Sequence, residues 1–226
     1  MTDALHTHLA LAQHRYALPG GAREVIFVRH GATTGETATT LKFGEMTLND
    51  PPLREEGQAQ AEAVAGRLRH ATLAAIFITP LCRTRQTAAP LVALTGLQPV
   101  VIPELREVHM GDWEQDFQAR AAAGDPLVRR MLAEENWEVI PGAERRVDFT
   151  ARIRAGVGRI IAATAPGSTS VAVIHGGTLG EICRAATGSR PFAFFGPENG
   201  SLTRIILHAD GHWSLRSYND VAHLSG

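Results

Sequence analysis

The sequence predicts an α/β protein, built as a three-layer α/β/α sandwich around a mostly parallel central sheet with an antiparallel edge. Two observations indicate this fold class. Short apolar, β-branched runs alternate with longer helix-like segments along most of the chain, which is typical of parallel strands joined by helices. Near the C-terminus two strand-like runs instead flank Asp210-Gly211, a dipeptide that favours a hairpin turn and therefore an antiparallel edge.

Each element is predicted from its periodicity. A short apolar run predicts a buried strand, and a longer segment with apolar residues three and four apart predicts a helix. In chain order the expected elements are the strand 25–28, the helix 55–71, the strand 74–79, the helix 83–96, the strand 98–102, a mostly helical stretch over 113–138, the helix 147–164, the strand 169–175, the helix 179–188 and the hairpin strands within 201–209 and 212–218.

The domain organisation is simple. We expect residues 1–23 to form an N-terminal arm and residues 24–226 to form a single domain, with 115–140 inserted as a helical cap. The cap carries Phe117 and Trp137 together with several arginines, any of which could line a substrate entrance. An amphipathic helix pair with its arginines in solvent is the favoured interpretation of that segment.

Composition narrows the classes of partner. The 226 residues include 22 Lys and Arg against 23 Asp and Glu, without a long run of one sign, so neither nucleic acid nor an anionic membrane is expected as a partner. Cys82 and Cys183 are far apart and do not suggest a disulfide framework. The first residues lack the pattern of a secretory leader, and we expect a cytoplasmic protein that acts on a small molecule.

Polar residues follow three of the predicted strands at the point where each strand ends. They are Arg29-His30-Gly31, then Thr79 with Arg83, and His175-Gly176-Gly177. Ligands of open α/β sheets bind beyond the carboxyl ends of the strands, so these residues are expected to meet in one crevice. The glycines, and a helix starting near Thr178, would let backbone amides approach an anion closely.

The residue types in this crevice suit phosphate chemistry. Arginine offers a planar fork of donors that matches phosphate oxygens and remains charged. A neutral imidazole can attack phosphorus, and a second histidine, if protonated, can neutralise charge on the phosphoryl oxygens. A single histidine at a strand end is more often structural, so it is the convergence of two histidines and two arginines that predicts an active site.

Seven stretches of the chain resemble, in order, the motifs of the histidine phosphatase superfamily, which includes the phosphoglycerate mutases and many small phosphatases. The likeness extends from residue 25 to about 203 and implies a phosphoglycerate mutase-like fold. The stretches are "VRHGATT" (28–34), "NDPPLREEGQAQA" (49–61), "TPLCRTRQTA" (79–88), "ELREVHMGDWE" (104–114), "PGAE" (141–144), "VIHGGT" (173–178) and "ENGSLT" (198–203).

The resemblance implies a role for each matching residue. His30 would be the nucleophile that becomes phosphohistidine, and Glu107 would be the general acid, with Glu104 and Glu114 as its rivals. The residues that would hold the phosphoryl group are Arg29, Arg83 and His175, together with the hydroxyl of Thr33 and a donor at Gly176.

The chain departs from the family pattern at Glu36. The family has an asparagine at this position, three residues after Thr33, and a carboxylate beside a phosphate would be repelled in a dry pocket. We expect Glu36 to point away, with Thr34 or Thr37 making the asparagine's contact. Otherwise Glu36 is a substrate-binding residue that selects an unusual or cationic substrate.

The likeness favours a phosphatase over a mutase. The mutases carry "NERHYG" and a longer insertion where this chain has "LREVHMG". We therefore expect a phosphomonoester hydrolase that needs neither metal nor cofactor and acts on a small phosphorylated metabolite. A phosphoglycerate-type phosphomutase and a non-catalytic phosphate-binding module are the alternatives, and a homodimer is left open.

Overall fold

A mixed six-stranded sheet forms the centre of the molecule. The computed structural model describes residues 16–35 and 39–224, and within them the strand order is β5-β4-β6-β1-β7-β8. The strands are β1 (Arg23–Arg29), β4 (Leu73–Ile78), β5 (Val100–Val101), β6 (Thr169–Ile174), β7 (Leu202–Leu207) and β8 (Trp213–Asp220). The first four in this order run parallel, β7 pairs antiparallel with both β1 and β8, and this confirms the predicted sheet with its antiparallel edge.

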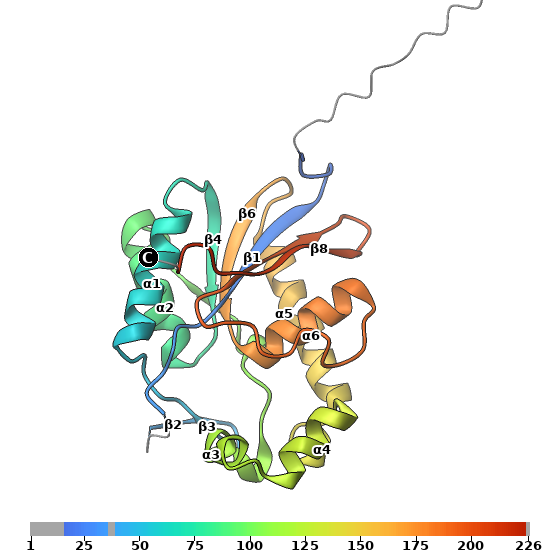
Figure 1. The fold of residues 1–226 in the computed structure, drawn as a ribbon. Coiled ribbons are helices and arrows are strands. Elements are labelled where there is room, and N and C mark those ends of the chain that lie inside the picture. Colours follow the sequence, from blue (N-terminus) through green and yellow to red (C-terminus); the bar gives the residue numbers. More distant parts are fainter. Residues whose placement is uncertain (1–15, 36–38, 225–226) are drawn as a thin grey trace, which may run out of the picture.

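Helices cover both faces of the sheet (Figure 1). One face carries α1 (Glu55–Leu68) and α2 (Cys82–Thr95), and the other carries α5 (Arg146–Ala163) and α6 (Gly176–Thr187). The alternation along β1 explains why both faces need a cover. Ile26 and Val28 pack into the apolar cluster under α1 and α2, whereas Val25 and Phe27 pack into the cluster under α5 and α6. The three predicted layers are therefore confirmed.

The smaller elements gather beyond the carboxyl ends of the parallel strands. They are β2 (Thr40–Phe43), β3 (Met46–Asn49), α3 (Phe117–Ala122), α4 (Pro126–Glu134) and the short 3₁₀ helices η1 (Pro103–Leu105), η2 (Gly111–Trp113) and η3 (Trp137–Val139). Figure 1 shows α3, α4 and the β2–β3 hairpin side by side at this end. The sequence prediction missed the hairpin, because its strands are only four residues long, too short for their alternation of apolar and polar residues to stand out.

The helical stretch predicted for 113–138 is interrupted rather than continuous. Gly124 has a φ of +69°, which ends α3, and the Asp125 side chain then accepts a hydrogen bond of 2.8 Å from Leu127 N to cap α4. Pro126 occupies the first position of α4, where its missing N–H costs nothing. The segment therefore folds as two short helices joined by a turn.

The two ends of this segment lie next to each other. Asp112 N donates to Pro141 O at 2.9 Å, and Glu144 N donates to His109 O at 2.9 Å. Gly111 adopts a φ of +56°, and a Cβ there would lie 2.2 Å from Pro141 O, so the contact requires glycine. Residues 115–140 thus leave the sheet domain and return to it at one place.

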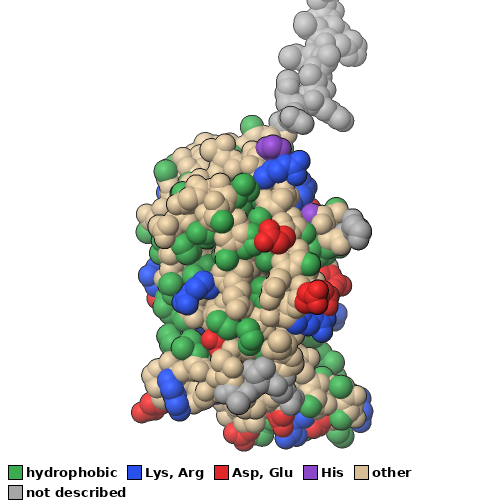
Figure 2. Space-filling view, turned by 90° about the vertical axis from the view of Figure 1, so that its left-hand side faces the viewer, with side chains coloured by type: hydrophobic (Ala, Val, Ile, Leu, Met, Phe, Trp, Pro, Cys, Tyr) green, Lys and Arg blue, Asp and Glu red, His purple; other side chains and the backbone are tan. Residues whose placement is uncertain are grey.

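The surface carries charges of both signs. On the face that is on the left in Figure 1, the Lys and Arg side chains are interspersed with Asp and Glu side chains (Figure 2). In the described ranges no helix is both long enough and apolar enough to cross a lipid bilayer.

Candidate active site

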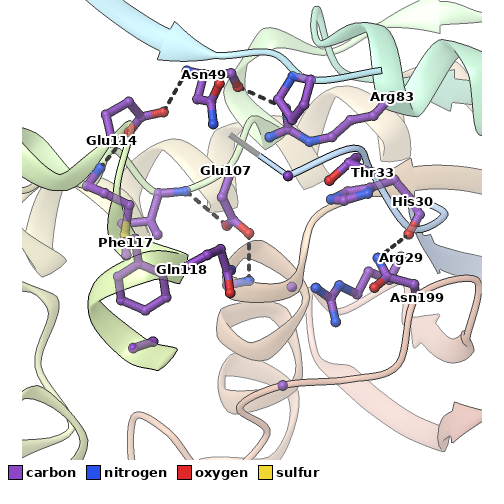
Figure 3. A pocket seen from close by; sticks show the side chains of 18 of the residues that line it. Arg29, His30, Thr33, Asn49, Arg83, Glu107, Glu114, Phe117, Gln118 and Asn199 are labelled. Atoms are coloured by element: carbon purple, nitrogen blue, oxygen red, sulfur yellow. Dashed lines mark hydrogen bonds between the residues drawn. The ribbon is translucent and has the colours of Figure 1, made fainter. Parts of the chain in front are cut away.

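Most of the predicted site residues line one cavity of about 640 Å³ at the carboxyl ends of the strands, whereas the fully buried His175 is not among its lining residues. Arg29 ends β1, His30 follows it, Arg83 lies in the first turn of α2, and Glu107 follows η1. Figure 3 shows the guanidinium groups of Arg29 and Arg83 on opposite sides of the His30 ring, with Glu107 across the opening. Thr33 and Gly176 also line this cavity.

The hydrogen bonds of His30 fix its tautomer. Its Nδ1 lies 2.8 Å from the carbonyl oxygen of Gly31, which can only accept, so Nδ1 carries the proton and Nε2 keeps its lone pair. Burial, then the charges of Arg83 and Arg29, hold the pKa of His30 well below its ordinary value. Asn199 donates to the His30 carbonyl at 2.8 Å and anchors the backbone. The ring is therefore neutral at neutral pH, with one free nitrogen.

His175 lies beside His30, with the ring centroids 5.2 Å apart, and is fully buried. Its Nε2 is 2.9 Å from Thr79 Oγ1, while its Nδ1 has no hydrogen-bond partner among the described residues. Burial, followed by the charge of Arg83, lowers the pKa of His175 well below its ordinary value. The second histidine is thus neutral at neutral pH in this arrangement, and its role as a phosphate ligand stays a prediction.

The two arginines are held by backbone carbonyls. Arg83 donates to Asn49 O at 3.0 Å and lies 3.6 Å from the Asp50 carboxylate. Arg29 donates to Pro197 O, and its buried Nε has no partner within the described part of the chain. Burial lowers the pKa of both arginines, and the negative charge of Glu107 opposes this shift. Two fixed cations with donors to spare make an anion pocket.

Glu107 is bonded to the start of α6. Its carboxylate accepts from Gly177 N and Thr178 N, each at 3.0 Å, and from Val108 N at 2.9 Å. The N-terminus of a helix favours a negative group in this position. The loop after η1 and the helix after β6 therefore hold the carboxyl group jointly.

The glycines of the motifs allow close packing around the site. A Cβ at Gly177 would lie 2.7 Å from Glu107 Oε1, and one at Gly176 would lie 3.4 Å from Arg29 Nε. A Cβ at Gly31 would lie 2.4 Å from Gly57 O in α1. Gly177 thus makes room for the Glu107 carboxylate and Gly31 allows the His30 loop to pack closely on α1. The backbone contact with phosphate that the sequence predicts for these glycines stays a prediction.

Comparison with known proteins identifies the family. The sequence profile of the histidine phosphatase superfamily (branch 1) matches residues 25–221. The chain belongs to the histidine phosphatase superfamily. This confirms the resemblance carried by the seven motifs.

Relatives of this chain include proteins named as phosphatases and proteins named as mutases. It is 32% identical over 200 residues to the glucosyl-3-phosphoglycerate phosphatase of Mycobacterium tuberculosis, covering 85% of this chain and 87% of the relative. It is 31% identical over 209 residues to a probable phosphoglycerate mutase of Yersinia enterocolitica, covering 89% and 94%. The structure of the mycobacterial phosphatase with inorganic phosphate is 31% identical, covers 90% of this chain and 100% of that one, and superposes with a TM-score of 0.70.

The two rival carboxylates, Glu104 and Glu114, have other partners. Glu104 forms an ion pair of 2.7 Å with Arg159 and does not line the cavity. Glu114 does line it, but its two oxygens accept from Asn49 N at 3.0 Å and Met110 N at 2.9 Å and so join the hairpin to the loop. Glu107 is the carboxylate whose charge acts on both Arg29 and Arg83.

Of the three residues named for the departure from the family pattern, Thr34, Glu36 and Thr37, the structure describes only Thr34. Glu36 and Thr37 lie outside the described residues. Thr34 is described, and its hydroxyl and amide both donate to Pro52 O, at 3.4 and 3.0 Å. Thr34 is not among the residues that line the cavity, so it does not make the predicted contact.

Sequence reasoning missed three residues that shape the site. Asn49 and Asn199 line the cavity, and Asn199 belongs to the quoted "ENGSLT" motif, which was the available signal. Arg152, in α5, donates to the carbonyls of Glu104, Arg106 and Glu107 at 2.7, 2.8 and 2.9 Å. It also donates to the Glu144 carboxylate at 2.6 and 2.7 Å. Arg152 lies well outside the quoted motifs, and no local pattern distinguishes it from the other arginines of its helix.

Proposed function

We propose that this protein is a phosphomonoester hydrolase that works through a phosphohistidine at His30, without a metal or a cofactor. The observation that carries the proposal is the hydrogen bond from His30 Nδ1 to Gly31 O, which leaves Nε2 as a free nucleophile between Arg29 and Arg83. A neutral, oriented imidazole in an anion pocket suits in-line attack on phosphorus.

In the first step His30 Nε2 forms a bond to phosphorus while the bond from phosphorus to the alcohol oxygen breaks. Arg29 and Arg83 hold the phosphoryl oxygens, and the free Nδ1 of His175 and the Thr33 hydroxyl contact the same group, with Gly176 beside them. Glu107 in its acid form gives its proton to the leaving oxygen, so that an alcohol departs. Glu36 is retained as a candidate contact to the substrate.

In the second step water attacks the phosphohistidine. Glu107, now a carboxylate, takes a proton from the water as the oxygen bonds to phosphorus, and the bond between phosphorus and Nε2 breaks. Inorganic phosphate leaves, and both His30 and Glu107 return to their starting states. One carboxyl group thus serves as acid and then as base.

Two relatives bear on the reaction. The mycobacterial relative named as a phosphatase, with a structure in complex with inorganic phosphate, supports hydrolysis of a small phosphorylated metabolite. The relative named as a probable phosphoglycerate mutase is similar to this chain at nearly the same identity, so phosphoryl transfer is the second candidate function. A cytoplasmic location and a homodimer stay predictions.

The test is phosphate release from a panel of phosphomonoesters between about pH 5 and 8 with EDTA present. Wild type is compared with His30→Ala, and with His212→Ala as a matched control at an exposed histidine. We expect chelator-resistant hydrolysis that is lost only in His30→Ala, together with an acid-labile phosphoryl label trapped on wild type by rapid quenching. Transfer between phosphoglycerates with little free phosphate would support the mutase instead. Absence of turnover with retained phosphate binding would indicate a binding module.

A further inference from the structure

The cavity has two chemically different ends. One end holds the arginines, His30 and Glu107. The other end is apolar and is built by α3, α4, η3 and the loop that precedes β7. Its side chains are Phe117, Val128, Met131, Leu132, Trp137 and Phe195. Both ends border the same cavity, so a substrate whose phosphate reaches His30 extends its leaving group toward the apolar end.

The apolar end is already assembled but is not covered by the protein itself. The Trp137 ring lies 6.4 Å from that of Phe117 and 5.7 Å from that of Phe195. Phe195 is 44% exposed and Leu132 is 43% exposed, although both border the cavity. Figure 3 shows Phe117 and Gln118 facing the cavity from α3, on the side opposite His30. Exposed apolar surface gathered around a pocket is typical of a binding site for an apolar group.

Among the described residues, the apolar end of the cavity has no positively charged group that could recognise an anion. Outside the phosphate pocket, the one described cation that lines the cavity is Arg54, which precedes α1 and pairs with Glu56. The arginines of the predicted cap do not line the cavity. Arg120 pairs with Asp116 and Arg130 with Glu134. Glu114 borders the cavity as a carboxylate and would repel a second anion.

We propose that the substrate is a phosphate monoester of an uncharged, apolar alcohol or phenol, with an alkyl or aryl group that packs on Trp137 and its neighbours. This inference rests on the proposed function and names its substrate class. A sugar-acid phosphate of the kind named for the relatives would place its carboxylate against apolar side chains and Glu114. The preference is therefore for the leaving group that buries apolar surface.

The test separates binding from turnover. Dissociation constants are measured by calorimetry for methyl-, propyl- and hexylphosphonate, which cannot be hydrolysed, and kcat/KM is measured for methyl, propyl and hexyl phosphate, whose leaving groups have similar basicity. Full burial of one methylene lowers a dissociation constant about fourfold. If each of the five added methylenes is half buried, the dissociation constant should fall about 30-fold from methyl- to hexylphosphonate. Glucose 6-phosphate and 3-phosphoglycerate should be poorer substrates than hexyl phosphate.

Two variants localise the effect. Leu132→Gln should weaken hexylphosphonate binding about fourfold and leave methylphosphonate unchanged. Leu127 lies on the same helix, is 37% exposed and does not line the cavity, so Leu127→Gln should change the binding of neither phosphonate. Equal affinities for the three phosphonates, or equal effects of the two variants, would overturn the inference. Binding that tightens with chain length in a protein that hydrolyses no monoester would support the apolar site and overturn the phosphatase function instead.

Discussion

Arg152 offers the sharpest test of how the candidate acid is positioned. The change is Arg152→Met, which keeps most of the side-chain volume and removes the guanidinium. Arg152 and Glu144 are about 11% and 10% exposed, so the substitution leaves Glu144 in a buried site with Arg106, at 3.6 Å, as its remaining cation. Removing one partner of a buried ion pair costs about 3 to 5 kcal/mol, and because Arg106 compensates in part we expect about 3 kcal/mol of lost stability.

The kinetic effect should depend on the leaving group. Arg152 anchors the carbonyl of Glu107 at 2.9 Å, and a displacement of about 1 Å at a reacting group costs on the order of 100-fold in rate. A hexyl phosphate needs a proton on its leaving oxygen, whereas a p-nitrophenyl phosphate needs almost none. We expect kcat/KM to fall about 100-fold for hexyl phosphate and less than tenfold for p-nitrophenyl phosphate.

The assay combines urea unfolding with the two kinetic measurements. Arg159→Met is the matched control, because Arg159 also lies in α5 and pairs with a glutamate, but its side chain is 47% exposed. A variant that folds with wild-type stability, or that loses equal activity on both esters, would refute the positioning role of Arg152. Rescue of stability without rescue of the leaving-group effect in Arg152→Lys would show that the charge alone does not place Glu107.

Three further predictions concern stability and reactivity. The buried His175 stays neutral in the folded protein, whereas this histidine gains a proton in the unfolded chain as pH falls below about 6.5. The free energy of unfolding therefore falls by up to about 1.4 kcal/mol per pH unit on the acid side. His175→Asn should flatten that side of a plot of unfolding free energy against pH. Gly57→Ala places a Cβ 2.0 Å from Ala32 O and should lose about 3 kcal/mol in urea unfolding, while Gly66→Ala, in open space on the same helix, should gain about 0.5 to 1 kcal/mol. Burial raises the pKa of Cys183 to about 12, so mass spectrometry after iodoacetamide treatment of the native protein near pH 7.5 should find it unmodified.

Much of the fold follows from local pattern. The buried runs of β1 and β6 and the Asp210-Gly211 turn are visible because each combines strong apolar periodicity with clear end signals. The start of α6 at Gly176 is not visible in this way, because two glycines argue against a helix and their role depends on Glu107, which is distant in sequence. The β2–β3 hairpin was missed because its stability comes from contacts such as the bond from Asn49 N to Glu114.

In the candidate site, too, some residues follow from local sequence and others depend on the folded arrangement. His30, Arg83 and Glu107 could be found because they stand in motifs and at strand ends. The neutral state of His175 could not, because it arises from full burial beside Arg83, which only the folded arrangement creates. Arg152 acts through three carbonyls of a loop more than 40 residues away, and no sequence spacing encodes that contact.

The hydrogen bonds that join Asp112 to Pro141 and His109 to Glu144 have a consequence for how such a protein can be re-engineered. Because residues 115–140 begin and end at one closed junction, another segment can be grafted there if it also replaces the packing of Val128, Met131 and Trp137 on the core. Under the proposed function, the residues around His30 and most of the apolar end of the cavity come from different stretches of sequence. If the proposed function holds, a chimaera carrying another protein's segment at this junction should keep the same reaction and change its preference among phosphate esters.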